Sequence, residues 1–303
     1  MISLKTPAQA SHPGGRPCVY YPETQGRLAA LSSLQDQTVL ITGAGRGIGK
    51  RLALGFASAG ASVGLLARSE AELDLARLEI EHAGGRALRI VADVRDYSQV
   101  AAAVESLQAE FGPVTVLVAA AGDQGPIGSF WETRPGEFAE TIRTNLLGTM
   151  HACHAVLPEM RRRRSGKIIV LTGGGTAHPR PGFAAYAASK AALARFVETL
   201  AEEVRDDNIQ VNCMSPGGSY THMTDEILQA GDRAGDKELA DAMLVRKTGG
   251  VPPDKQIRLA LFLASERSNH ISGKLIHVND DWQRLEHANI HPEIFTVRRV
   301  QKI

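Results

Sequence analysis

The sequence predicts a doubly wound α/β fold, in which seven parallel strands form one sheet with helices on both faces. Short β-branched or aliphatic runs alternate with longer amphipathic segments from Thr38 onward, and this alternation is typical of parallel sheets. The chain has 303 residues, of which 43% are hydrophobic, and this is enough for one large core. We therefore expect a single domain.

The strands are expected where the short apolar runs stand, and the helices between them. The strand runs cover residues 38–41, 62–66, 87–91, 114–118, 167–171, 209–214 and 274–278. The helical segments cover residues 47–59, 70–83, 97–111, 136–163, 186–206 and 253–265. Ligands of such sheets bind beyond the carboxyl ends of the strands, so functional residues are expected in the loops that follow the strands.

The two ends of the chain differ in composition from this domain, which is expected over residues 34–282. Residues 1–33 contain four prolines and the pair Gly14 and Gly15, a composition that breaks regular structure and indicates an extended N-terminal arm. Residues 283–303 are interpreted as a C-terminal tail, with the hypothesis that it reaches a neighbouring subunit.

The charge balance argues against nucleic acid and membrane partners. The 34 basic and 33 acidic residues give a net charge of +1, so no excess charge attracts an anionic polymer or lipid surface. The basic run Arg161–Arg164 is expected to end a helix, where cations complement the helix dipole. Neither a signal-peptide pattern nor a run of about 18 apolar residues is found. A small-molecule ligand is expected instead.

The cysteines and histidines do not predict a metal site. Three cysteines stand apart, without disulfide or metal-ligand spacing, which indicates a reducing, cytoplasmic environment. His151 with His154, and His287 with His291, stand at helical spacing but lack a third ligand. No metal is therefore expected.

A glycine-rich turn, TGAGRGIG at residues 42–49, follows the first expected strand and leads into a helix. Gly43 permits the tight turn, Gly47 lets a pyrophosphate approach the backbone, and Gly49 allows close packing of helix and strand. The helix N-terminus favours the phosphate charge, and a second strand about twenty residues on supports this interpretation. A Rossmann-like dinucleotide site is expected, with contacts from Gly43, Arg46, Gly47, Ile48 and Gly49.

The end of the second expected strand indicates which nicotinamide dinucleotide binds. NAD is usually selected by an acidic side chain that hydrogen-bonds the ribose 2′-hydroxyl, and the run Ala67-Arg68-Ser69 offers none. Arg68 presents a permanently charged planar fork that suits a 2′-phosphate, and Arg46 can contact the same group. We therefore expect NADP(H), with NAD as the alternative, and contacts from Arg68 and Ser69.

Tyr186 and Lys190 stand four residues apart in an expected helix and therefore share one face. A free phenol has a pKa near 10, and a neighbouring ammonium favours the phenolate and lowers that pKa. Tyr186 can then protonate a developing alkoxide during reduction and take the proton back during oxidation. The sequence thus predicts both residues as catalytic and as contacts of the cofactor.

The glycine turn TGxxxGxG and the YxxxK pair together resemble the short-chain dehydrogenase/reductase family, over residues 34–282. The resemblance implies an NAD(P)-dependent oxidoreductase that moves a hydride between the nicotinamide and a ketone or secondary alcohol. Polyol or sugar-like and 3-oxoacyl compounds are the leading substrate classes. The resemblance also implies a homodimer or homotetramer, and a lid over the substrate formed by the charge-rich residues 222–250.

The resemblance assigns roles to further positions. Asn145 matches a helix asparagine that helps to hold the lysine and a proton-relay water. The other matches imply cofactor contacts in three loops, formed by Asp93 and Val94 at the adenine, by Ala120, Ala121 and Gly122 after the fourth strand, and by Pro216, Gly217 and Thr221 near the nicotinamide. Where the family usually has Asn-Asn-Ala-Gly, this chain has Ala119-Ala120-Ala121-Gly122, which keeps only the backbone groups.

The main departure from the family concerns the serine that orients the substrate. Its usual position, about thirteen residues before the tyrosine, is occupied here by Gly173. Thr172 is the first candidate to supply the missing hydroxyl and Thr176 the second, because three consecutive glycines can reshape this loop. Without such a donor the oxyanion loses a contact worth about 10²–10³ in rate.

Two other functions are open at this point. A non-catalytic NADP-binding sensor or scaffold accounts for the missing serine, but it gives no reason for Asn145, Tyr186 and Lys190. A nucleotide-sugar epimerase or dehydratase normally has a different glycine spacing and a larger C-terminal substrate domain than this chain has room for.

Overall fold

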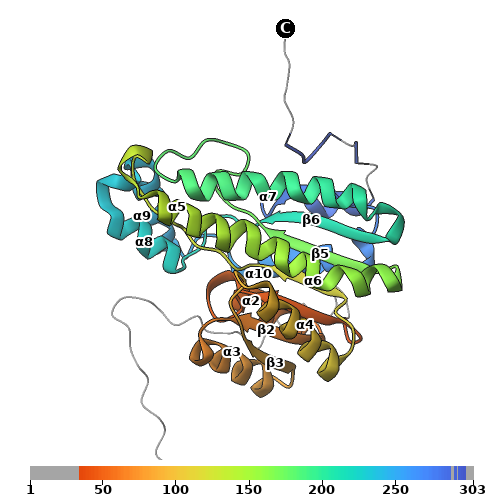
Figure 1. Ribbon diagram of the computed structural model, residues 1–303. Coiled ribbons are helices and arrows are strands. Elements are labelled where there is room, and N and C mark those ends of the chain that lie inside the picture. Colours follow the sequence, from red (N-terminus) through yellow and green to blue (C-terminus); the bar gives the residue numbers. More distant parts are fainter. Residues whose placement is uncertain (1–33, 288–289, 292, 298–303) are drawn as a thin grey trace, which may run out of the picture.

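Seven parallel strands form one sheet in the order β3-β2-β1-β4-β5-β6-β7, with helices on both faces (Figure 1). The computed structural model describes residues 34–287, 290–291 and 293–297. The predicted fold class is confirmed, and each predicted strand end lies within two residues of the observed one. The strands are β1 (Thr38–Thr42), β2 (Ser62–Ala67), β3 (Arg86–Val91), β4 (Val116–Ala119), β5 (Gly166–Leu171), β6 (Ile209–Ser215) and β7 (Leu275–His277).

The sheet is covered by three long helices on each face. One face packs on α2 (Gly47–Ser58), α3 (Glu70–His82) and α10 (Pro253–Ala264), and the other on α4 (Tyr97–Phe111), α6 (Gly148–Arg163) and α7 (Ala184–Glu203). Alternate strand residues enter the two cores: Ile41 joins the first and Leu40 the second, both fully buried. This alternation follows from the pleat of a strand, and it explains why the strands read as continuous apolar runs.

The segment predicted as a helix over residues 136–163 is helical throughout, but it is not one uninterrupted α-helix. The segment consists of α5 (Pro135–Ile142), a π-helical turn at Arg143–Leu147, and α6. The π turn is centred on Asn145, whose side chain is fully buried and bonds to a neighbouring loop. Such turns are frequent at functional sites, and hydrophobic periodicity alone does not reveal them.

The charge-rich residues 222–250 fold into two helices, α8 (His222–Ala230) and α9 (Asp236–Thr248), joined by a 3-10 turn at Gly231–Ala234. They lie together at one end of the molecule (Figure 1). A small separate core holds them there, built from Phe183, Tyr186, Ile227, Ala230, Ala234 and Ala242. The proposed lid is therefore packed directly against Tyr186.

The described part of the C-terminal tail folds back on its own chain. Leu275 in β7 donates a backbone hydrogen bond to the carbonyl of Phe295 at 2.6 Å, and the backbone N–H of Val297 donates to Glu198 of α7 at 2.8 Å. The contribution of this tail to subunit assembly stays a prediction. The N-terminal arm predicted over residues 1–33 lies outside the described residues. No helix among the described residues has the length and apolar character needed to span a membrane.

Candidate active site

The turn between β1 and α2 has a backbone shape that only glycine fits. Gly43 has φ +68°, and a Cβ on it would lie 2.8 Å from the Cα of Ala121. A Cβ on Gly49 would lie 2.2 Å from the carbonyl oxygen of Gly43. Both distances are far inside van der Waals contact, so side chains are excluded at these two positions, where the turn presents its backbone.

The first turn of α2 keeps its backbone donors for a ligand. The helix begins at Gly47, no side chain caps it, and its first turn contains no acidic residue. The first N–H groups of a helix have no partner within the helix, and together with the helix dipole they favour an anion. This donor set fits the pyrophosphate of a dinucleotide, as predicted from the glycine spacing.

Thr42 joins the glycine turn to the loop after β4. Its Oγ1 accepts hydrogen bonds from the backbone N–H groups of Ala120 and Ala121, both at 3.1 Å. The loop is therefore fixed through the backbone of Ala120, which stands where the resemblance expects an asparagine, and of Ala121. Thr221, the first residue before α8, also reaches the turn, since its Cγ2 lies 3.5 Å from the Cβ position on Gly47.

Arg46 and Arg68, the two arginines predicted to bind a 2′-phosphate, both lie on the wall of one cleft, together with an acidic residue that sequence reasoning missed. Glu72 of α3 lies on the same wall, and its Oε1 is 3.7 Å from Nη1 of Arg46. Ser69 has a structural task as well, because its Oγ accepts the N–H of Glu72 as the N-cap of α3.

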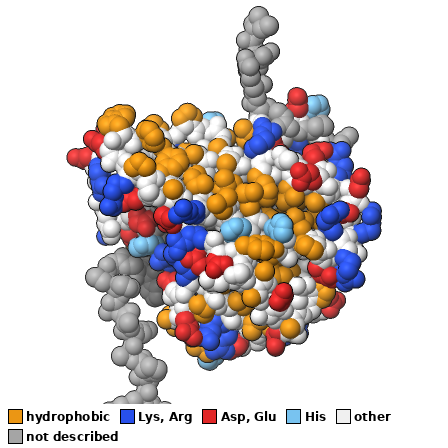
Figure 2. All heavy atoms as spheres, in the orientation of Figure 1, with side chains coloured by type: hydrophobic (Ala, Val, Ile, Leu, Met, Phe, Trp, Pro, Cys, Tyr) orange, Lys and Arg blue, Asp and Glu red, His pale blue; other side chains and the backbone are white. Residues whose placement is uncertain are grey.

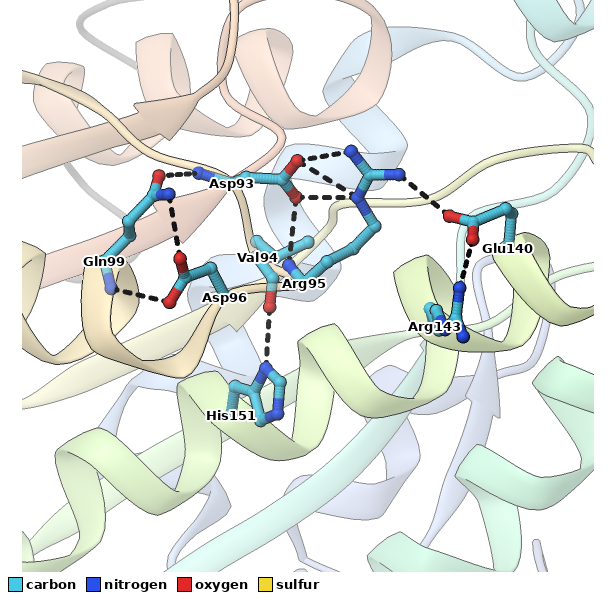
Figure 3. Close-up of polar contacts among 8 residues, drawn as sticks. All are labelled: Asp93, Val94, Arg95, Asp96, Gln99, Glu140, Arg143 and His151. Atoms are coloured by element: carbon cyan, nitrogen blue, oxygen red, sulfur yellow. Dashed lines mark hydrogen bonds and ion pairs between the residues drawn. The ribbon is translucent and has the colours of Figure 1, made fainter.

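Asp93, predicted to bind adenine, is fixed by a chain of charged side chains (Figure 3). Arg95 donates to both carboxylate oxygens of Asp93, with Nη2 at 2.6 Å, and its Nη1 donates to Glu140 of α5 at 2.9 Å. The hydrogen bonds from Arg95 lower the pKa of Asp93. On the other side, the carbonyl of Val94 is 2.8 Å from Nδ1 of His151. The loop that carries Asp93 and Val94 is thus held by α5 and α6.

The predicted site residues line one cleft of about 1220 Å³ beyond the carboxyl ends of the strands. Asn145 is the exception, since its neighbour Thr144 reaches the wall instead. The predicted residues on the wall are Gly43, Arg46, Gly47, Ile48, Gly49, Arg68, Ser69, Asp93, Val94, Ala120, Ala121, Gly122, Thr172, Tyr186, Lys190, Pro216, Gly217 and Thr221.

Tyr186 and Lys190 share one buried face of α7 at the bottom of this cleft. Lys190 donates from Nζ to the carbonyl of Leu171 at 2.9 Å, and Nζ lies 5.6 Å from the ring centroid of Tyr186. Burial lowers the pKa of Lys190 to about 8. The lysine is therefore held beside the tyrosine by the last carbonyl of β5.

The expectation that Lys190 lowers the pKa of the phenol needs correction. Burial raises the pKa of Tyr186, and the cation that opposes this rise is Arg180 rather than Lys190. The physical reason is that the helix spacing places the pair correctly but also removes both groups from water, which disfavours each charged form.

Asn145 holds the loop after β4 against α7. Its Oδ1 accepts the N–H of Asp123 at 2.7 Å, and its Nδ2 donates to the carbonyl of Asp123 and to Oγ of Ser189, each at 2.9 Å. Asn145 Oδ1 and Lys190 Nζ lie 3.5 and 3.6 Å from the Cβ position on Gly122. Asn145 is thus close to the lysine, although its hydrogen bonds go to the neighbouring loop and helix residues.

The space that a side chain at position 173 would fill is occupied by the hydroxyl of Tyr186. A Cβ on Gly173 would lie 2.6 Å from Oη of Tyr186. Thr172 lies on the cleft wall, but its hydroxyl donates to the carbonyl of Met214 at 3.4 Å, and the hydroxyl of Thr176 donates to the carbonyl of Gly173 at 2.6 Å. The catalytic role expected of Thr172 stays a prediction, and it requires that hydroxyl to leave β6.

Several residues on the cleft wall were missed by sequence reasoning. Gln124 is only 3% exposed, and its Nε2 has no hydrogen-bond partner among the described residues. Arg180 precedes α7, while Glu226 and Glu238 come from the lid helices α8 and α9. No local pattern identifies these residues, because they come from separate loops and helices that meet only in the folded chain.

The family model described as short chain dehydrogenase matches residues 37–231. A cyclohexanol dehydrogenase from Rhodococcus sp. is 32% identical over 265 residues, which cover 81% of this chain and 96% of that protein.

Among solved structures, a tryptophan variant of the actinorhodin polyketide ketoreductase with NADPH is similar, with a TM-score of 0.75, 27% identity, and coverage of 81% of this chain and 97% of that chain. A gluconate 5-dehydrogenase from Burkholderia cenocepacia with NADP and tartrate has a TM-score of 0.73 and 29% identity, covering 83% of this chain and 96% of that chain. This chain is therefore an enzyme of the short-chain dehydrogenase/reductase family.

Proposed function

We propose that this enzyme uses NADP(H) to interconvert a ketone and a secondary alcohol, with Tyr186 as the group that exchanges the proton. The observation that carries the proposal is the position of Tyr186. It lies on the wall of the same cleft as the glycine turn, one helical turn from Lys190. When bound, the dinucleotide supplies or accepts the hydride.

The preference for NADP(H) rests on the charges near the end of β2. Arg68 and Arg46 both line the cleft, and a guanidinium binds a phosphate more strongly than it binds a hydroxyl. The polyketide ketoreductase and the gluconate 5-dehydrogenase named above were solved with NADPH and NADP, which supports this choice.

Residues of the chain itself transfer the proton and stabilise the charges of the reaction. During reduction Tyr186 gives its hydroxyl proton to the oxygen on which negative charge develops, and during oxidation it takes that proton back. The guanidinium of Arg180 favours the phenolate left behind, while the carbonyl of Leu171 keeps the ammonium of Lys190 beside the tyrosine. We assign Thr172 as the second donor to the substrate oxygen. A Thr172→Val variant with unchanged turnover would remove that assignment.

The substrate is proposed to be a polyol, a sugar-like compound or a 3-oxoacyl compound. A homodimer or homotetramer in the cytoplasm is proposed with it. Hydrophobic side chains gather on the face crossed by α5 and α6 (Figure 2), and Tyr97, Leu147 and Met150 are exposed large apolar residues of α4, the π turn and α6. An exposed apolar face of this kind supports association between subunits.

The experiment combines cofactor binding with a substrate screen. Fluorescence titration of NADPH and NADH gives the preference, which is expected to favour NADPH by roughly ten- to hundredfold for one charge-assisted contact. Arg68→Ala should remove most of this preference. Ketones and alcohols are then screened by nicotinamide absorbance. Tighter NADH than NADPH contradicts the cofactor assignment, and tight binding without turnover on a broad panel contradicts the proposed reaction.

A further inference from the structure

The loop between β5 and α7 places on the cleft wall an arginine to which the proposed reaction assigns no contact with the substrate. The guanidinium of Arg180 lies over the ring of Phe183, 3.9 Å from its centroid, and 5.4 Å from the ring centroid of Tyr186. The side chain is 13% exposed. A permanent positive charge is therefore held, largely shielded from water, beside the group that exchanges the proton.

This guanidinium is only partly used by the protein. Its Nη2 donates to Oε2 of Glu238 in α9 at 2.8 Å. Within the described part of the chain, Glu238 is the one hydrogen-bond acceptor of the Arg180 side chain, whereas a guanidinium carries five N–H donors. Donors thus remain for a second acceptor, and the ring of Phe183 together with Glu238 fixes the direction in which they are presented.

The loop beside Arg180 is kept free of side chains. A Cβ on Gly174 would contact Cδ of Arg180 at 3.5 Å, and a Cβ on Gly175 would lie 3.4 Å from Cβ of Arg180. Gly173, next to them, adjoins the hydroxyl of Tyr186. The three glycines therefore leave room between the tyrosine hydroxyl and the guanidinium, so that one small molecule can contact both groups.

We infer that the substrate carries a carboxylate, which Arg180 binds while the reacting carbonyl or hydroxyl faces Tyr186. This inference rests on the proposed function and specifies its substrate class. A guanidinium matches the geometry of a carboxylate and is shielded here, so the contact is strong. The carboxylates of Glu226, Glu238 and Asp241 line the same cleft, and their repulsion favours a singly charged group over a phosphate dianion.

The short distance between the two contacts limits the size of the substrate. The guanidinium carbon of Arg180 lies 5.4 Å from the centre of the Tyr186 ring, so we expect the carboxylate and the reacting carbon to belong to one short oxo or hydroxy acid. The amide of Gln124 on the same wall, whose Nε2 has no hydrogen-bond partner among the described residues, is a further candidate donor to such an oxygen-rich molecule.

The test compares oxo acids with their methyl esters, which differ by the one charge. Acetoacetate and levulinate are assayed beside methyl acetoacetate and methyl levulinate, and the readout is the acid-to-ester ratio of kcat/KM with NADPH. The wild-type ratio should exceed one. Arg180→Met, which keeps an apolar stem over Phe183, should lower that ratio by roughly ten- to hundredfold, mainly through KM of the acid.

Two further variants distinguish a specific contact between Arg180 and the carboxylate from a general effect of positive charge. Arg180→Lys keeps the cation and should retain part of the preference for the acid. Lys237→Met removes another cation of the cleft wall, whose side chain is 84% exposed, and it should leave the acid-to-ester ratio within about twofold because solvent screens that charge.

A binding measurement makes the test independent of turnover. With NADP present, levulinate should raise the melting temperature of the wild-type enzyme more than methyl levulinate does, and Arg180→Met should abolish the difference. Equal shifts for acid and ester, or an acid preference that survives in Arg180→Met, overturn the inference. Turnover of the esters that disappears in Tyr186→Phe would leave the proposed function standing in that case, and binding of the acid without any turnover would count against the proposed function instead.

Discussion

Replacing Gly173 by alanine should damage catalysis by displacing the hydroxyl of Tyr186. The added Cβ would lie 2.6 Å from Oη, so this oxygen must retreat by 0.8 Å to reach ordinary van der Waals contact at 3.4 Å. A misplacement of about 1 Å in a reacting group can lower the rate by about 10²-fold. We therefore expect kcat of Gly173→Ala to fall by roughly ten- to hundredfold, with the dissociation constant of NADPH nearly unchanged.

The neighbouring glycine provides the matched control. A Cβ on Gly174 meets its nearest atom, Cδ of Arg180, at an ordinary 3.5 Å, so Gly174→Ala should keep kcat within about threefold. The kcat of Gly173→Ser should exceed that of Gly173→Ala, because the serine hydroxyl adds a donor for the substrate oxygen. The reasoning is refuted if Gly173→Ala turns over at the wild-type rate, since the phenol oxygen would then either lie elsewhere or not be needed.

Three other predictions concern the cofactor site and the core. Glu72→Gln should tighten the binding of NADPH several-fold in a fluorescence titration and leave the binding of NADH nearly unchanged. The reason is that Glu72 lies 3.7 Å from Arg46, where its charge repels a 2′-phosphate. Equal changes in the two dissociation constants would contradict this prediction. Arg95→Gln should weaken the binding of NADPH and NADH by the same factor, since Arg95 holds Asp93, which we propose contacts the adenine common to both. A selective loss of NADPH binding would contradict this prediction. Burial lowers the pKa of Lys167 to about 7, whereas an unfolded lysine keeps its proton up to about 10.4. Unfolding therefore takes up a proton between these values, and the free energy of unfolding should rise with pH there by at most about 1.4 kcal/mol per unit. Denaturant unfolding at pH 7 and pH 9.5 should show a smaller rise in Lys167→Met, and an identical rise would exclude this assignment.

The sheet and the glycine turn could be predicted because their signals are local. Each strand is a short apolar run, and Gly43 and Gly49 stand where a side chain would meet backbone atoms within 3 Å. The loops that follow parallel strands meet at one edge of the sheet, which is why the sequence alone predicts that residues as distant as Arg46 and Thr221 share one site.

The parts that could not be predicted depend on contacts between distant segments. The π turn around Asn145 forms because that side chain bonds Asp123 and Ser189, and the periodicity of an apolar face does not encode it. Arg180 meets Glu238 only after the lid has folded. The pKa of Tyr186 was misjudged because the spacing of the YxxxK pair shows proximity, whereas burial, which has the opposite effect, depends on the lid core.

The most direct test of this account compares Tyr186→Phe with the wild-type enzyme on one established substrate. Single-turnover hydride transfer is measured at saturating NADPH, together with the dissociation constant of NADPH. We expect the rate to fall by roughly 10²–10⁴-fold, the usual contribution of a positioned acid or base, while NADPH binding changes by less than about twofold. Hydride transfer at the wild-type rate in Tyr186→Phe would contradict the central claim that this phenol exchanges the proton.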